Sequence, residues 1–250
     1  MKMTRKILPA LAMLIVSAIM LSTASFAWFA QNNTVEASGM NVMVQSAAKF
    51  LQINNQATDH ESDDEKKFSD KAIAADTVVP ELDLVHAKIE EGAVNWYTAK
   101  GANPDSYGAD ADGLQKFTGE VDGKYARVDD FYLRMSEGSA DTLKNLIVGS
   151  VTVTAKDNSL AKALRVLVVG PNGSQIWSFA AGADSGAMVA VSGTDVIANE
   201  ILIAGSAGYQ PTHIAVYTYF DGEDESAFTD NTKNISNAVS VKISFTEKTT

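Results

Sequence analysis

The sequence contains no cysteine and only three histidines, and these absences exclude several kinds of chemistry. Without a thiol there is neither a cysteine nucleophile nor a disulfide, so stability must come from a hydrophobic core and from strand pairing. His60, His86 and His213 are far apart in the chain, and no HExxH pair of zinc ligands occurs. Gly-x-Ser-x-Gly elbows and phosphate-binding glycine loops are also missing. We therefore expect no enzyme activity, no catalytic residue, no metal centre and no cofactor.

Basic residues are scarce. The chain has 20 Lys and Arg against 31 Asp and Glu, which gives a formal charge of -11. Affinity for nucleic acid comes mainly from Lys and Arg that neutralise phosphates, so nucleic-acid binding is not expected. The same charge repels anionic lipid, and it favours a soluble exported protein.

The N-terminus has the three parts of a signal peptide. Lys2, Arg5 and Lys6 precede an apolar run over residues 7–21, and Ser25 and Ala27 place small residues where a signal peptidase cuts. This predicts a signal helix over 1–27, cleavage after Ala27, and a secreted, cell-surface protein that meets the membrane only through its leader. The alternative is an uncleaved anchor, because apolar residues continue through Ala30.

The remaining residues, 28–250, read as a single β domain. Apolar and polar residues alternate over residues 34–45, 125–135, 146–155 and 239–245, and a Pro-Asn-Gly turn joins 163–170 to 174–179 in a hairpin. Further strands are expected at 77–86, 201–204 and 213–220, and helical turns at 160–164 and 194–200. Long surface excursions are expected around 54–71 and 99–123. This pattern predicts an all-β fold, an antiparallel, jelly-roll-like β-sandwich.

Two groups of side chains are candidate binding residues. Clustered carboxylates in Gly-containing loops are candidate ligands for a divalent cation such as Ca²⁺, but the EF-hand spacing is absent and solvated loops are the favoured interpretation. Three tryptophans could form a sugar-stacking platform, or they could be core residues. The carboxylates are Asp110, Asp112, Asp221, Glu223 and Asp224, and the tryptophans are Trp28, Trp96 and Trp177.

The segment SFAWFAQNNTVEASGMNVMV, and less closely the segment HIAVYTYFDGEDESAF, resemble the TasA and camelysin family of Gram-positive bacteria. The resemblance implies a jelly-roll fold, cleavage by the signal peptidase SipW, and self-association into extracellular filaments of the biofilm matrix. It also implies that the N-terminal strand of one subunit completes the sheet of the next. The anchors of this donor strand would be Trp28, Phe29, Val35, Met40, Val42 and Val44. The chain differs from the family in lacking an acidic residue after the aromatic pair.

Strand addition of this kind is physically reasonable, because backbone hydrogen bonds supply affinity and alternate side chains fix the register. The sequence therefore predicts a non-enzymatic structural subunit of a surface fibre or matrix. The alternative is a monomeric secreted binding module for a glycan, a cell-wall component or a host ligand.

Overall fold

The computed structural model describes residues 42–46, 51–55, 68–69, 71–73, 82–98, 115–117, 119–155, 162–224, 227 and 239–249. The chain divides into two compact units, Met1–Thr34 and Val35–Thr250, and every described residue belongs to the second. The predicted signal peptide 1–27 lies outside the described residues.

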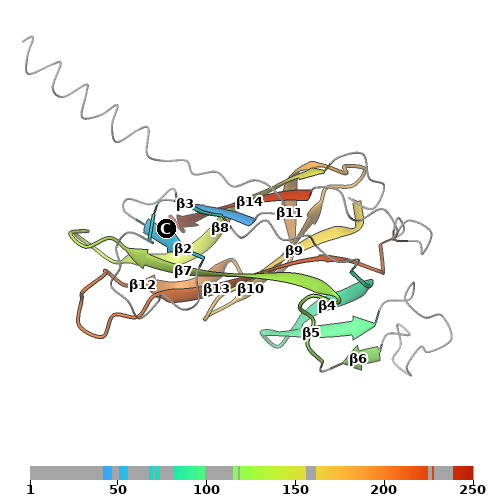
Figure 1. The fold of residues 1–250 in the computed structure, drawn as a ribbon, viewed down its shortest axis with the longest axis horizontal. Helices are drawn as coiled ribbons and strands as arrows, with labels where there is room; N and C mark the ends of the chain where they lie inside the picture. Colours follow the sequence, from blue (N-terminus) through green and yellow to red (C-terminus); the bar gives the residue numbers. More distant parts are fainter. Residues whose placement is uncertain are drawn as a thin grey trace, which may run out of the picture. The chain divides into compact units, whose positions relative to one another are not determined.

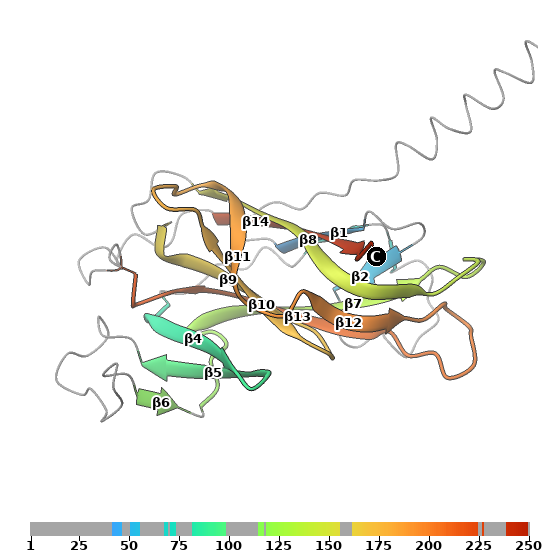
Figure 2. The ribbon, with the colours of Figure 1, turned by 180° about the vertical axis from the view of Figure 1, so that it is seen from behind.

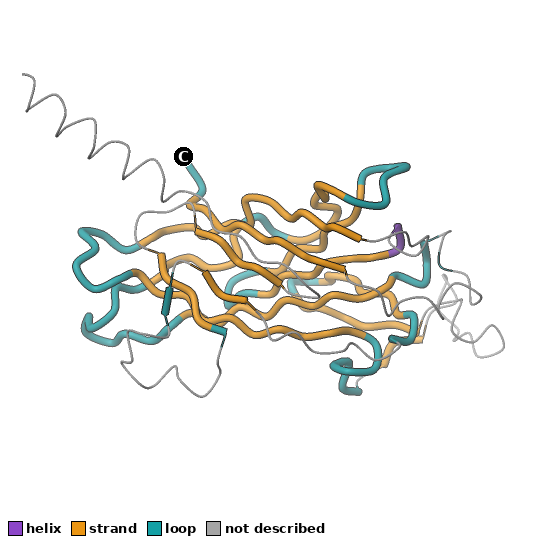
Figure 3. The backbone as a smooth tube through the Cα atoms, turned by 45° about the horizontal axis from the view of Figure 1, so that its top comes forward, coloured by secondary structure: helices purple, strands orange, loops and turns teal. Residues whose placement is uncertain are grey.

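The described part of the chain consists of β-strands with no α-helix, and a single short helical turn occurs at Lys162 and Ala163 (Figure 3). The strands are β1 (Val42–Ser46), β2 (Leu51–Asn54), β3 (Lys71–Ile73), β4 (Val85–Glu90), β5 (Ala93–Thr98), β6 (Gln115–Phe117), β7 (Ala126–Met135), β8 (Leu143–Ala155), β9 (Leu164–Val169), β10 (Ser174–Phe179), β11 (Gly186–Gly193), β12 (Val196–Ile201), β13 (Thr212–Phe220) and β14 (Val239–Glu247).

Eleven strands form one large sheet, which runs β2-β7-β13-β9-β10-β11-β8-β14-β1-β3, with β12 added on β8 (Figure 1). Among the strand pairs in the described residues, only β1 with β14 is parallel. The prediction of an all-β, antiparallel fold is thus confirmed. β11 joins the two halves of the sheet, because Gly186 and Ala187 pair with β8 and the residues from Met188 onward pair with β10.

The two halves of the large sheet share one hydrophobic core. In β14, Val241, Ile243 and Phe245 are buried, and the residues between them are partly exposed, as the alternation predicts. Their cluster also receives side chains from strands of the other half, namely Phe131 and Leu133 of β7, Val166 and Val168 of β9, and Ile214 and Val216 of β13.

A second sheet, β4-β5-β6, covers the opposite face of the β7-β13-β9-β10 half (Figure 2). Val85 and Ala87 of β4 pack there with Leu167 of β9, Ile176 of β10 and Tyr219 of β13. β9 is therefore buried on both of its faces. This explains why its sequence, LRVLVV, is an apolar run with little alternation.

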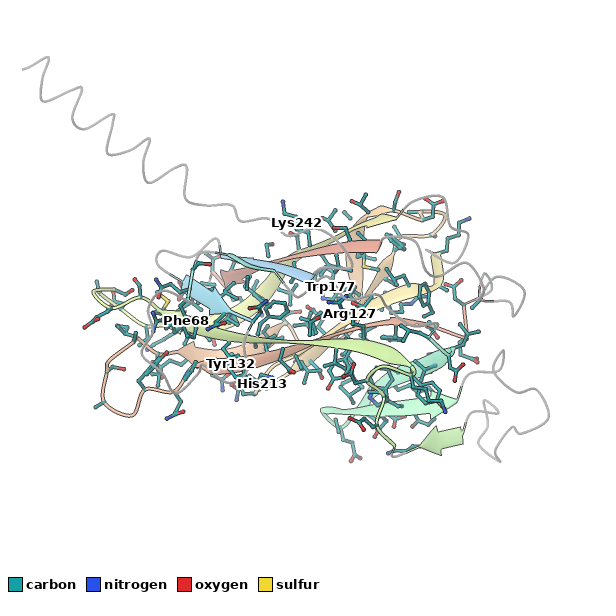
Figure 4. The ribbon with its side chains drawn as sticks, viewed as in Figure 1. Phe68, Arg127, Tyr132, Trp177, His213 and Lys242 are labelled. Atoms are coloured by element: carbon teal, nitrogen blue, oxygen red, sulfur yellow. The ribbon has the colours of Figure 1, made fainter. Side chains whose placement is uncertain are left out.

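The face of β7 and β13 that meets the main core carries several polar groups. Arg127 forms an ion pair with Asp129, with 2.9 Å from its Nε to Oδ2. Burial raises the pKa of Asp129 above its ordinary value, because its effect exceeds the opposing effect of the Arg127 guanidinium. Figure 4 shows Arg127 and Trp177 in the interior and Tyr132 and His213 on the outside of the strands. Within the described part of the chain, the Thr218 hydroxyl is buried without a hydrogen-bond partner.

Replacing Thr218 by valine is expected to raise the free energy of unfolding by about 1 kcal/mol, since it removes a buried unsatisfied hydroxyl and keeps the shape of the side chain. Thr218→Ser keeps the hydroxyl and loses the methyl group, so it should lower stability. Urea denaturation measures both changes. A destabilised Thr218→Val variant would contradict this account and would show that the hydroxyl is bonded.

Most of the predicted strands are present, and the hairpin of residues 163–179 is confirmed: β9 and β10 pair with Val169 opposite Ser174. Two predictions near residue 200 are wrong. The helical turn expected at 194–200 is instead β12, which pairs with β8, and the strand expected at 201–204 ends at Ile201. The excursion expected at 99–123 contains β6, which pairs with β5.

Candidate functional site

The strand β1 occupies a position between β14 and β3, which we call the β1 slot. Val42, Val44 and Ser46 stand opposite Val241, Ile243 and Phe245 of β14, and on its other side β1 pairs with β3 over three residues. The three partners in β14 belong to the main core. If β1 were removed, β14 would become a sheet edge with unpaired backbone groups above a buried face, which is a site for another strand.

The donor-strand residues predicted from the sequence are only partly within the described residues. Val42 and Val44 belong to β1, where they pair with β14 of the same chain. The other four, Trp28, Phe29, Val35 and Met40, lie outside the described residues, as does Ala27.

A separate groove of about 450 Å³ lies where the β4-β5 hairpin meets the turn between β9 and β10, and we call it the Trp96 groove. Its walls are the start of β5, the end of β9, the β9-β10 turn and β13, which supply Gly92, Ala93, Val94, Trp96, Val169, Gly170, Pro171, Asn172, Gly173, Ser174 and Tyr217. The ring of Trp96 packs on Tyr217, with 5.6 Å between ring centroids, and meets Tyr219 edge to face at 5.2 Å.

The β9-β10 turn that forms one wall of the groove is fixed by hydrogen bonds. Gly170 N donates to Gly173 O across the turn, and Asn172 N donates to Ile197 O of β12. The Asn172 side chain in turn accepts a bond from the backbone N of Asn199. A larger residue does not fit in place of Gly173, because its Cβ would overlap the side chain of Thr194 and the carbonyl oxygen of Val196. The wall is therefore rigid.

Of the two tryptophans within the described residues, Trp96 alone lies at the groove. Trp177 is 8% exposed and belongs to the main core, and Trp28 is outside the described residues. The three tryptophans are thus not shown to form the predicted platform, but Trp96 and Tyr217 together form an aromatic surface. Tyr217 and the β4-β5 hairpin were not identified from the sequence.

The sequence does contain a local signal for the β4-β5 hairpin. Glu91 and Gly92 both have positive φ, of 52° and 81°, and Glu90 pairs with Ala93 across them. Two positive φ values in a two-residue loop define a type I′ turn, for which a residue followed by glycine between two strand-like segments is the typical sequence. The Glu-Gly pair between VHAKIE and AVNWYT fits this pattern.

The acidic residues that follow β13 form ion pairs. Asp221 accepts a hydrogen bond from the Nδ1 atom of His86 at 2.8 Å and lies 3.4 Å from the Nε of Arg165. Arg165 also donates to Asp224, at 2.8 Å. The carboxylate of Asp221 additionally caps the turn by accepting from the backbone N of Glu223. These contacts tie β4, β9 and the end of β13 together.

Among the residues that the structure describes, no group of three or more His, Asp or Glu side chains is arranged to hold a metal ion. Asp110 and Asp112 lie outside the described ranges. A cation bound at Asp221 or Asp224 would compete with the guanidinium of Arg165, and the use of these carboxylates as cation ligands stays a prediction. His213, on the exposed side of β13, pairs with Asp130 at 2.6 Å and stacks on Tyr132.

No family model, no curated protein and no solved structure matches the chain. Within the described ranges, no helix has both the length and the apolar composition needed to cross a membrane.

Proposed function

We propose that this chain is a non-enzymatic, exported structural subunit of an extracellular fibre or biofilm matrix, comparable to the TasA and camelysin proteins that its N-terminal segment resembles. Subunits assemble when β1 of one copy enters the β1 slot of the next. The observation that carries the proposal is the position of β1: it is the strand nearest the N-terminus among the described residues, and it pairs in parallel with β14 in an otherwise antiparallel sheet.

The proposed fold of the subunit is a jelly-roll-like sandwich. Two observations support this. The halves of the eleven-stranded sheet bury their side chains in one cluster, and β11 passes from pairing with β8 to pairing with β10. In such a fold, β3 and β14 flank a slot for one strand, and any copy of β1 fits it with the same register.

Exchange between copies keeps every backbone hydrogen bond that β1 makes within its own chain. Strand pairing therefore contributes equally before and after the exchange. The extent of exchange depends on protein concentration and on the new contacts between subunits. A head-to-tail exchange does not close on itself, so it continues as a filament.

The connection that follows β1 limits how far apart the subunits can be. Residues 47–50 join Ser46 of β1 to Leu51 of β2. At about 3.5 Å per residue this connection reaches roughly 17 Å, so the donor strand cannot extend far from its own subunit. Neighbouring subunits must consequently be in direct contact, with the β14 edge of one close to the start of β2 of the other.

Electron microscopy of the chain that begins at Trp28 tests the proposal. We expect filaments whose formation depends on concentration, and we expect them to be absent when residues 28–44 are deleted. Circular dichroism of the deletion variant shows whether it still folds. Monodisperse particles of the intact chain at every concentration would contradict assembly and would favour a monomeric binding module.

A further inference from the structure

We propose that the Trp96 groove binds an uncharged saccharide, with one sugar ring stacked on the aromatic surface of Trp96 and Tyr217. This inference goes beyond the proposed assembly. The groove is formed by β5, β9, β10 and β13, whereas β1, β3 and β14 form the assembly slot, so either proposal can fail without the other.

The lining of the groove determines the class of ligand. Its eleven residues include no Asp, Glu, Lys, Arg or His. Asn172 and Ser174 supply polar side chains, and three glycines leave backbone groups accessible beside them. A sugar ring has one apolar C–H face and a rim of hydroxyl groups, so it matches an aromatic surface bordered by neutral hydrogen-bonding groups.

Charged ligands fit the groove poorly. Burial raises the pKa of Tyr217, and the carboxylates of Asp130 and Asp122 raise it further, so its phenol is neutral at physiological pH. The chain as a whole carries a formal charge of -11, which repels phosphates and acidic sugars. An uncharged ligand with many hydroxyl groups is repelled neither by the carboxylates near Tyr217 nor by the net charge of the chain.

The groove is already organised for binding. The contact with Tyr219 at 5.2 Å orients the Trp96 ring, and the hydrogen bonds between the β9-β10 turn and β12 fix the opposite wall. Asn172 uses its Oδ1 atom to hold Asn199, which leaves its Nδ2 group to donate to a sugar hydroxyl. Little conformational entropy is therefore lost on binding. The volume of about 450 Å³ is within the usual range of small-ligand sites.

Isothermal titration calorimetry tests the proposal with three neutral tetrasaccharides, built from glucose, galactose and N-acetylglucosamine, and with an oligogalacturonate as the acidic comparison. We expect at least one neutral tetrasaccharide to bind and the oligogalacturonate to bind at least tenfold more weakly. Trp96→Ala should weaken binding at least tenfold, and Trp96→Phe should weaken it less, because a phenyl ring preserves part of the stacking surface.

Trp177→Phe is the matched control, since it also changes one tryptophan but lies in the main core, and it should leave the affinity unchanged. If Trp96→Ala does not fold, Asn172→Ala at the exposed turn gives a second test, with an expected loss of about threefold or more. The proposal is overturned if no neutral tetrasaccharide binds, if the acidic one binds equally well, or if the Trp96 and Asn172 variants both bind as the wild type does.

Discussion

Gly193→Ala is expected to lower the free energy of unfolding by about 3 kcal/mol or more, which for a domain of this size shifts the midpoint of thermal unfolding by roughly 10 °C. Gly193 ends β11 with a φ of 106°, a conformation that alanine adopts only with strain. A Cβ there would also overlap the carbonyl oxygen of Ser174 and come within 2.9 Å of Ile89. The same substitution would thus disturb the β10-β11 pairing and the contact with β4.

Gly182→Ala separates the two causes of this loss. Gly182 has a similarly positive φ of 86°, but nothing lies within 4 Å of the position its Cβ would take. The control should therefore show only the backbone strain, about 1 kcal/mol. Equal losses in the two variants, measured by urea and thermal denaturation, would contradict the close approach of β11 to β10.

The elements that sequence patterns predicted well are those whose signal is local. In β14 the alternation of Val241, Ile243 and Phe245 with polar residues reports one buried face, and the strand has one. The turn of Pro171, Asn172 and Gly173 determines a hairpin by its own backbone preferences, and it joins β9 to β10 at the expected residues.

The elements that were missed depend on contacts with distant parts of the chain. Residues 194–200 have no strong strand pattern, but β8 extends from Leu143 and offers a long edge that β12 pairs with. Pairing with this edge overrides the weak local preference. The β4-β5 hairpin differs, because its Glu91-Gly92 turn is a local signal, but the apolar face of β9, β10 and β13 that the hairpin covers is not predicted by any local pattern.

The two candidate sites also differ in how much of them the sequence could predict. The assembly role of the N-terminal strand was inferred from the resemblance to the TasA and camelysin family and stays a prediction, and the structure adds that Val42 and Val44 pair with β14 of the same chain. The Trp96 groove could not be inferred. Trp96, Asn172 and Tyr217 come from three separate segments, and only the folding of β4 and β5 onto the large sheet brings them together.

The absence of cysteine makes one experiment especially clear, because two introduced thiols have no competitors. Gln45 of β1 stands opposite Ser244 of β14, and Ser244 is partly exposed between the buried Ile243 and Phe245. Adjacent strands lie about 4.8 Å apart, which is within the range that a disulfide can bridge. In the variant Gln45→Cys/Ser244→Cys, the disulfide therefore joins β14 to the β1 strand that occupies the slot, whether that strand comes from the same chain or from another. The single variants serve as controls.

Filaments of this double variant, oxidised and then denatured without reductant, provide the measurement. If β1 is exchanged between copies, each disulfide links two chains, and electrophoresis shows a ladder of covalent multimers that reductant converts to monomer. A dilute, unassembled sample of the same variant should give only internally linked monomer. If the filaments also give only internally linked monomer, then β1 remains in its own sheet and assembly by strand exchange is wrong.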